Sequence, residues 1–167
     1  TLLAAAGEPD IAGKLKAGYE MNGTTYKVHL DGFNQLPYLT GEDDKSPRAY
    51  FFYVSDDGDL TALRMYNWKI VFMEQRARGT LQVWAEPFTE LRVPKIFNLR
   101  TDPFERADVT SNTYYDWLID RAYLLVPAQA FAMQMAQSLV EFPPRQESAS
   151  FTVGAMLEKL QAGLPSS

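Results

Sequence analysis

The sequence contains no cysteine and only one histidine, His29. Without cysteine, the chain can form neither a disulfide nor a thiolate metal site, and a cysteine nucleophile is excluded. Composition leaves room for a Ser-His-Asp triad, but no G-x-S-x-G nucleophile elbow is present. His29 stands on a predicted strand, two residues before Asp31, and we interpret it as a structural or surface residue.

Long apolar runs and blocks of basic residues are also missing. No apolar run approaches the roughly 20 residues that a membrane-spanning helix needs. The formal net charge is -5, which argues against a nucleic acid or an anionic membrane as the main partner. We therefore expect a soluble protein with neither of these partners. The compartment stays open between cytoplasm and periplasm.

Apolar and aromatic residues are plentiful, at 46% and 13% of the 167 residues. These fractions are typical of a packed globular protein, and the length suits one domain or slightly more. Four segments rich in aromatic and β-branched residues read as strands, at residues 49–54, 60–64, 68–73 and 96–99. Asp57-Gly58 predicts a hairpin between the first two, so we expect an antiparallel sheet with one face that needs cover.

Two segments near this sheet have alternative interpretations. Residues 80–85 are expected to form either an extra strand or an ordered loop, and Pro87 and Pro94 bound a polar insertion. The acidic run at residues 55–59 resembles part of a calcium loop. Its spacing and flanking strands do not fit an EF-hand, so we favour a solvated hairpin turn.

The region before the strands is polar and rich in turn signals. Residues 1–7 are typical of the last turns of a helix that Gly7 ends. Residues 8–23 are interpreted as a linker with one helical turn at residues 11–16. Residues 24–30 alternate polar and apolar side chains and suit a short exposed strand.

Helices are predicted after the strands. Asn112 is the expected N-cap of the first, Pro127 is expected to break or kink it, and Pro143 is expected to end the next segment. The expected inward residues of these two segments are Trp117, Leu118, Ala122, Leu125, Phe131, Met135, Leu139 and Phe142. A last helix is predicted after Ser150 or Thr152, with Val153, Met156, Leu157 and Leu160 inward. Strands followed by helices indicate an α+β fold, a four-stranded antiparallel sheet covered by C-terminal helices.

Two basic residues, Arg64 and Lys69, flank a predicted turn and could in principle bind a sulfate group. We favour a structural role, in which Arg64 pairs with Asp102 or Glu105 and Trp68 fills the core. The turn from Asp102 to Glu105 is then a fold signature and not a site.

Three groups of motifs together resemble a known family. The first is Arg64, two residues, then Asn-Trp-Lys69. The second is Phe97-Asn98-Leu99 followed by Asp102-Pro103 and Glu105, and the third is Asp31-Gly32, Leu36-Pro37, Leu39 and Gly41. Taken in their order along the chain, with the third group first, they resemble the C-terminal region of sulfatases, in the alkaline-phosphatase-like superfamily, and bacterial arylsulfatases most closely.

The resemblance implies a fragment without the catalytic centre. Residues 1–45 would be the end of a catalytic-domain helix plus a connecting segment, and residues 46–167 the C-terminal α+β domain. The family uses a formylglycine and a divalent metal, with calcium the expected ion. The Cys/Ser-x-Pro-x-Arg motif that yields formylglycine has no counterpart, since Ser46-Pro47-Arg48 lacks its spacing. We therefore assign no catalytic, cofactor-binding or metal-binding residue and expect the chain alone to be inactive.

The parent protein would hydrolyse sulfate esters, aryl sulfates in particular, and its N-terminal catalytic domain would be the partner of this chain. We expect the hairpin at residues 55–59 and the segment around Trp84 to shape one rim of the substrate cleft. Two alternatives stay open. The chain is a stand-alone interaction or homo-oligomerisation module, or it belongs to a related phosphate-ester hydrolase.

Overall fold

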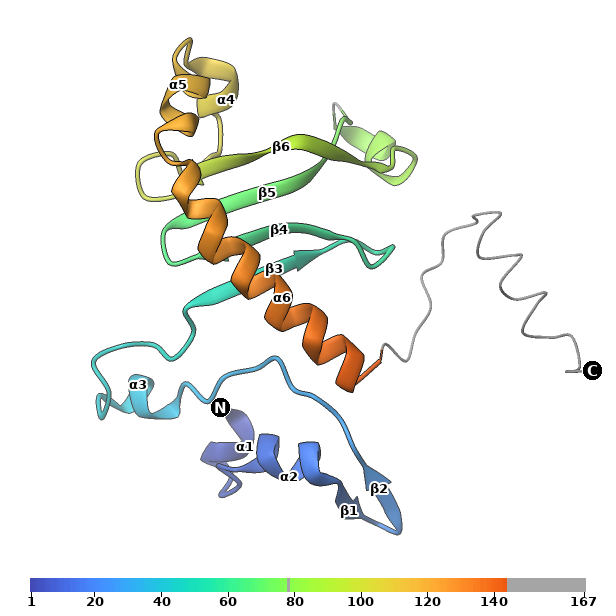
Figure 1. Ribbon diagram of the computed structural model, residues 1–167. Helices are drawn as coiled ribbons and strands as arrows, with labels where there is room; N and C mark the ends of the chain where they lie inside the picture. Colours follow the sequence, from blue (N-terminus) through green and yellow to red (C-terminus); the bar gives the residue numbers. More distant parts are fainter. Residues whose placement is uncertain (78, 144–167) are drawn as a thin grey trace, which may run out of the picture.

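The computed structural model describes residues 1–77 and 79–143. A four-stranded antiparallel sheet and the long helix α6 (Leu125–Glu141) form its two main layers (Figure 1). The sheet comprises β3 (Tyr50–Val54), β4 (Leu60–Met65), β5 (Trp68–Gln75) and β6 (Phe88–Asn98), in that spatial order. The α+β architecture expected from the sequence is therefore confirmed.

The predicted hairpin between β3 and β4 is present. Ser55 N–H donates to the Asp59 carbonyl oxygen at 2.9 Å, and Gly58 N–H to the Ser55 carbonyl oxygen at 3.0 Å. Gly58 has φ +88°, a conformation that costs glycine little. Tyr66 at φ +51° turns the chain from β4 into β5. Each strand thus lies antiparallel to the one before it.

Strand β6 is longer than predicted. We expected it to begin at Ile96, after a polar insertion between Pro87 and Pro94, but it begins at Phe88. Lys95 lies opposite Val71 and Glu90 opposite Met73, so residues 91–94 form an irregularity between these two pairs. Proline is tolerated at a bulge of an edge strand, because no ladder hydrogen bond is lost there. Residues 80–85 were expected to form either an extra strand or an ordered loop. They form no strand, and the 3₁₀ helix η1 (Thr80–Trp84) lies there, before β6.

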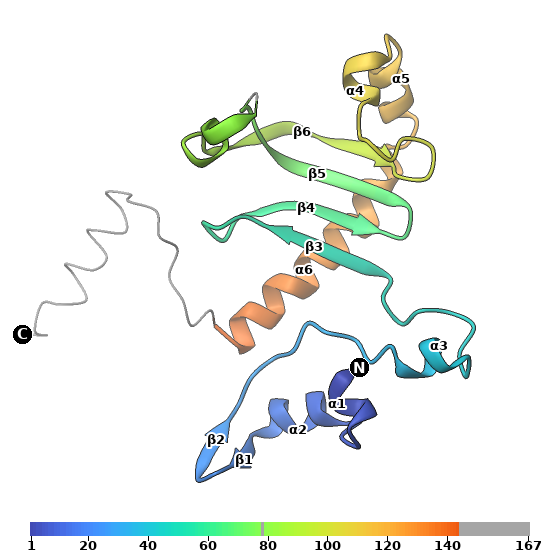
Figure 2. The ribbon, with the colours of Figure 1, turned by 180° about the vertical axis from the view of Figure 1, so that it is seen from behind.

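Within the described residues, helix α6 covers one face of the sheet, whereas the other face is covered only at its β6 end, where Tyr114 stacks on Phe97. Leu63, Ile70 and Ile96 lie opposite one another in adjacent strands, are 0% exposed, and form the centre of the core. From α6, Ala128 is buried in this core and Phe131 packs against it. Figure 2 shows the opposite side, where no helix of the described part of the chain lies over the strands. We call this side the uncovered face.

The helices begin and end at residues different from those predicted. Helix α4 (Ala107–Thr110) precedes α5 (Tyr114–Ile119), whose N-cap is Thr113 and not Asn112. The short η2 (Ala122–Leu124) then leads into α6, and Ala122 is exposed. Pro127 stands in the first turn of α6, where its missing N–H needs no partner, so it causes no break.

The expected inward stripe of α6 is confirmed at Phe131 and Met135, which are half-buried. Leu139 is 42% exposed, contrary to the prediction. The expected last helix after Ser150 or Thr152 lies outside the described residues.

The N-terminal part contains more structure than a linker. Helix α1 (Leu2–Ala5) ends before Gly7 at φ +98°, and α2 (Ile11–Ala17) matches the expected helical turn. Strands β1 (Tyr19–Met21) and β2 (Thr24–Tyr26) form a hairpin that we assigned in part to the linker. Asn22-Gly23, with both φ angles positive, is its turn. A short α3 (Leu36–Thr40) precedes the sheet.

Tyr114 caps the free edge of β6. Its hydroxyl donates to the Ile96 carbonyl oxygen and accepts from the Ile96 N–H, both at 3.0 Å. The side chain is 2% exposed and its ring stacks on Phe97. Burial raises the pKa of Tyr114 to about 12, and the hydrogen bond to the Ile96 backbone opposes that rise. The exposed edge of a sheet is thus closed by a side chain of α5.

We expect Tyr114→Phe to lower the free energy of unfolding by about 2 kcal/mol at neutral pH, because two buried backbone groups lose their partner. The tyrosine's raised pKa favours the folded state below pH 10, and this stability is lost as the pH rises from about 10 to 12. The gap between wild type and variant should therefore shrink by about 1.4 kcal/mol per pH unit in that window and close before its upper end.

Urea titrations from pH 8 to 12 test this, with the exposed neighbour Tyr115→Phe as control. A gap that stays constant across this range would contradict the assignment.

Candidate functional site

His29 and its neighbours do not form a catalytic triad. His29 Nδ1 lies 3.2 Å from Asp31 Oδ1, and both line a hollow of about 750 Å³ together with Ser138. The Ser138 hydroxyl donates to the Met135 carbonyl oxygen at 2.7 Å, within its own helix. The Asp31 side chain is 95% exposed, whereas a triad aspartate is buried. The Ser138 hydroxyl is therefore engaged within its own helix, and the interpretation of His29 as a structural or surface residue stays a prediction.

The acidic turn at residues 55–59 shows no calcium-binding geometry. Asp59 N–H donates to Ser55 Oγ at 3.0 Å, and Ser55 Oγ donates to Asp59 Oδ2 at 3.3 Å, so these groups stabilise the turn itself. Within residues 1–77 and 79–143, no group of three or more His, Asp or Glu side chains is placed to hold a metal ion.

Lys69, and not Arg64, is the basic residue that pairs with the turn after β6. Its Nζ lies 2.8 Å from both carboxylate oxygens of Glu105 and 4.6 Å from the centre of the Tyr53 ring. Arg64 instead donates from Nε to the Tyr66 carbonyl oxygen at 3.0 Å. The predicted pairing of Arg64 with Asp102 or Glu105 is therefore wrong. Arg64 is on β4, one strand farther from β6 than Lys69, and strands are roughly 4.8 Å apart.

Asp102 organises the start of α4. Its Oδ1 accepts from Arg106 N–H at 3.1 Å and its Oδ2 from Ala107 N–H at 2.8 Å. A carboxylate that accepts from the first amides of a helix stabilises that helix. The turn therefore acts as a fold signature, as the sequence indicated.

A second ion-pair cluster ties β5 and β6 to α4, and we did not predict it. Lys95 Nζ lies 2.5 Å from Glu74 and 2.7 Å from Asp108. Burial lowers the pKa of Lys95, but hydrogen bonds to Asp108 and Glu74 outweigh it and raise the pKa overall. The same Lys95 contact lowers the pKa of Glu74. Lys95 lies near the irregularity in β6, whose register the sequence pattern did not reveal.

Taken together, these contacts define an α+β domain whose charged residues stabilise its own turns and edges. A search of the described part of the chain for a helix long and apolar enough to cross a membrane finds none.

Comparisons with known proteins identify the class of this domain. The family described as the C-terminal region of aryl-sulfatase matches residues 45–157, more than half of the chain. The chain therefore belongs to this family. No curated protein matches it.

A solved structure with the same fold is the sulfatase PsFucS1 from Pseudoalteromonas sp. The two share 23% sequence identity with a TM-score of 0.51 over 75% of this chain. The match spans only 23% of the length of that sulfatase. The similarity extends the fold assignment, and the present chain corresponds to a minor part of that protein.

We expect Lys69→Met to lower the free energy of unfolding by about 1–2 kcal/mol, because Glu105 keeps a half-buried charge without its partner. Chemical denaturation of Lys69→Met, Glu105→Gln and the double variant tests the pairing. The double variant should lose less than the sum of the single losses. Lys45→Met, at an exposed position, is the matched control. Strictly additive losses would show that the two residues do not stabilise each other.

Proposed function

We propose that this chain is the C-terminal domain of a sulfatase that hydrolyses sulfate esters, aryl sulfates in particular. In this proposal the domain packs against a catalytic domain of the same protein. The match to the aryl-sulfatase C-terminal family over residues 45–157 is the observation that carries it. The same match favours a sulfate ester over a phosphate ester.

The chain's own residues support a non-catalytic role. The motif that yields formylglycine is missing from the sequence, and the described acidic residues offer no metal site. The groups expected in the parent, formylglycine and calcium, do not fit any residues described here. We therefore assign both to the catalytic domain and derive no step through them. The boundary between connecting segment and domain, near residue 45, belongs to the same proposal.

The two segments that we expect at the rim of the substrate cleft lie at one end of the sheet. The β3–β4 hairpin and the η1 segment both project from that end, since both connect strands there (Figure 1). Trp84 in η1 is 80% exposed, an unusual position for so large an apolar side chain. An exposed aromatic ring at the same end of the sheet as a polar turn suits contact with an aryl substrate.

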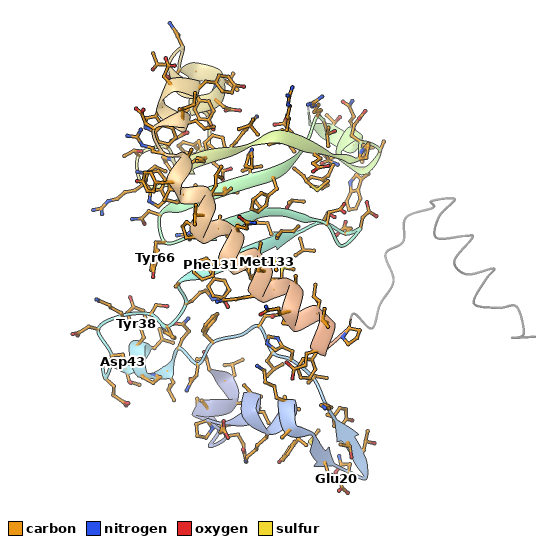
Figure 3. All side chains as sticks on the ribbon, viewed as in Figure 1. Glu20, Tyr38, Asp43, Tyr66, Phe131 and Met133 are labelled. Carbon is orange, nitrogen blue, oxygen red and sulfur yellow. The ribbon has the colours of Figure 1, made fainter. Side chains whose placement is uncertain are left out.

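A second candidate function is oligomerisation through α6. Val126, Met133 and Val140 repeat every seven residues on its outer side and are 72%, 55% and 83% exposed. Residues seven apart share one helix face. Figure 3 shows Met133 and Phe131 on this helix. This apolar stripe is the observation that favours a self-associating module.

The proposal predicts that the 167-residue chain alone does not release nitrophenol from 4-nitrophenyl sulfate, whereas the parent protein does. In the parent, Trp84→Ala and deletion of residues 56–58 should each change the ratio of kcat/KM for 4-nitrophenyl sulfate and a bulkier naphthyl sulfate by about tenfold.

The control is Phe104→Ala, which is equally exposed but lies in the turn after β6, at the opposite end of the sheet. An unchanged ratio in both rim variants would refute the rim assignment. A parent without sulfate-ester hydrolysis would refute the proposed function.

A further inference from the structure

The uncovered face of the sheet is defined by strand register. Neighbouring residues along a strand point to opposite faces, and residues opposite each other in adjacent strands point to the same face. Leu63 and Ile70 face α6, so Arg64 and Lys69 face away from it. Phe51 and Phe97 belong to the same outward row, but at the β6 end of the row Phe97 is buried beneath Tyr114 of α5, so the exposed part of this face lies towards β3.

The two ends of this face differ in charge. Towards β6, Lys69 and Lys95 are matched by Glu105, Glu74 and Asp108. Towards β3, a hollow of about 420 Å³ contains two arginines and no acidic residue. We call it the basic hollow, and it is lined by Ser46, Arg48, Ala49, Tyr50, Phe51, Tyr53, Arg64 and Tyr66.

Both arginines are held in place without an acidic partner. The Arg48 guanidinium lies 5.3 Å from the Phe33 ring centre and 5.7 Å from that of Phe51, within reach of cation–π attraction. Arg64 uses only Nε, towards the Tyr66 carbonyl oxygen. In the described part of the chain neither arginine forms an ion pair. A guanidinium fixed in this way retains donors suited to a carboxylate.

Exposed aromatic side chains surround these arginines. Phe51 is 45% exposed and Tyr66 71%, and Tyr66 projects from the β4–β5 turn (Figure 3). Arginine and aromatic residues are enriched where protein surfaces meet. The chain as a whole is acidic, at -5, so this basic and aromatic surface stands apart from its average.

We propose that the uncovered face is the surface that meets the catalytic domain of the parent sulfatase, with a carboxylate of that domain bound between Arg48 and Arg64. This inference rests on the proposed function. The chain spans only 23% of the length of the solved sulfatase, which leaves a large remainder to cover such a face.

The position of α1 supports this occupant. The resemblance assigns α1 to the catalytic domain, and its N-cap Thr1 accepts from Gln35 N–H at 2.9 Å and donates to the Phe33 carbonyl oxygen at 3.0 Å. Phe33 in turn lies against Arg48. The element assigned to the catalytic domain is therefore linked, through one residue, to the basic hollow.

Cysteine accessibility tests the proposal directly, because the chain has no cysteine of its own. Phe51→Cys and Tyr66→Cys report on the uncovered face, and Met133→Cys, 55% exposed, reports on the apolar stripe of α6, the alternative contact surface. The rate of iodoacetamide labelling is followed by peptide mass spectrometry in the 167-residue chain and in the parent protein. Labelling at 51 and 66 should be about tenfold slower in the parent, because an interface core excludes water. The rate at 133 should change less than twofold.

Charge reversal tests the carboxylate. In the parent, Arg48→Glu or Arg64→Glu should return the labelling rate at position 51 towards that of the isolated chain, whereas Arg48→Lys should largely preserve protection. Arg100→Glu, at an exposed position outside the hollow, is the control. Unchanged protection in both reversal variants would overturn the carboxylate contact.

Other outcomes overturn the surface itself. Protection at 133 alone would place the contact on α6, and equal rates at all three positions would leave the uncovered face in solvent. If protection at positions 51 and 66 in the isolated chain increases with protein concentration, a second copy of the chain covers the uncovered face. Hydrolysis of 4-nitrophenyl sulfate is measured on the same samples. Protection at positions 51 and 66 without hydrolysis would support the proposed interface but refute the proposed sulfatase function.

Discussion

The backbone groups of Ile96 must find partners at the free edge of β6, and the Tyr114 hydroxyl supplies both. An unpaired sheet edge is open to association with other strands, so its closure by a side chain protects the fold. The same tyrosine fixes α5 beside the sheet, and α5 leads through η2 into α6. The path of the chain after β6 therefore depends on this contact, which directs α6 across one face of the sheet only.

The resulting asymmetry explains the distribution of charge. On the face opposite α6, Lys69 and Lys95 are neutralised by acids from β5, the turn after β6, and α4, which stabilises that end of the sheet. Among the described residues, the hollow at the other end has no acidic lining residue, and there Arg48 and Arg64 form no ion pair. A domain with a completed core but an incomplete outer face is suited to work as part of a larger protein. Membership of the aryl-sulfatase C-terminal family agrees with this division of labour.

Local patterns predicted the elements well where local forces decide. The alternation of aromatic and β-branched residues located the four strands, and Asp57-Gly58 located the first hairpin.

The errors in the predicted elements have physical causes. Pro94 and Pro127 were interpreted as interruptions, yet an edge bulge and a first helical turn accommodate them without loss. Strand β1 and its pairing with β2 were missed, although Asn22-Gly23 signals a hairpin. Glu105 pairs with Lys69 on β5 and not with Arg64 on β4, because β5 lies nearer to the turn that contains Glu105. The spacing of residues along the sequence does not reveal this difference in distance.

The most direct test of the account is the identity of the native protein. An antibody raised to the 167-residue chain would capture that protein from the source cells, and its mass and its release of sulfate from 4-nitrophenyl sulfate would be measured together. The account predicts a polypeptide several times heavier than 18.9 kDa that hydrolyses the ester. A native polypeptide of 18.9 kDa without this activity would contradict it and would favour the self-associating module.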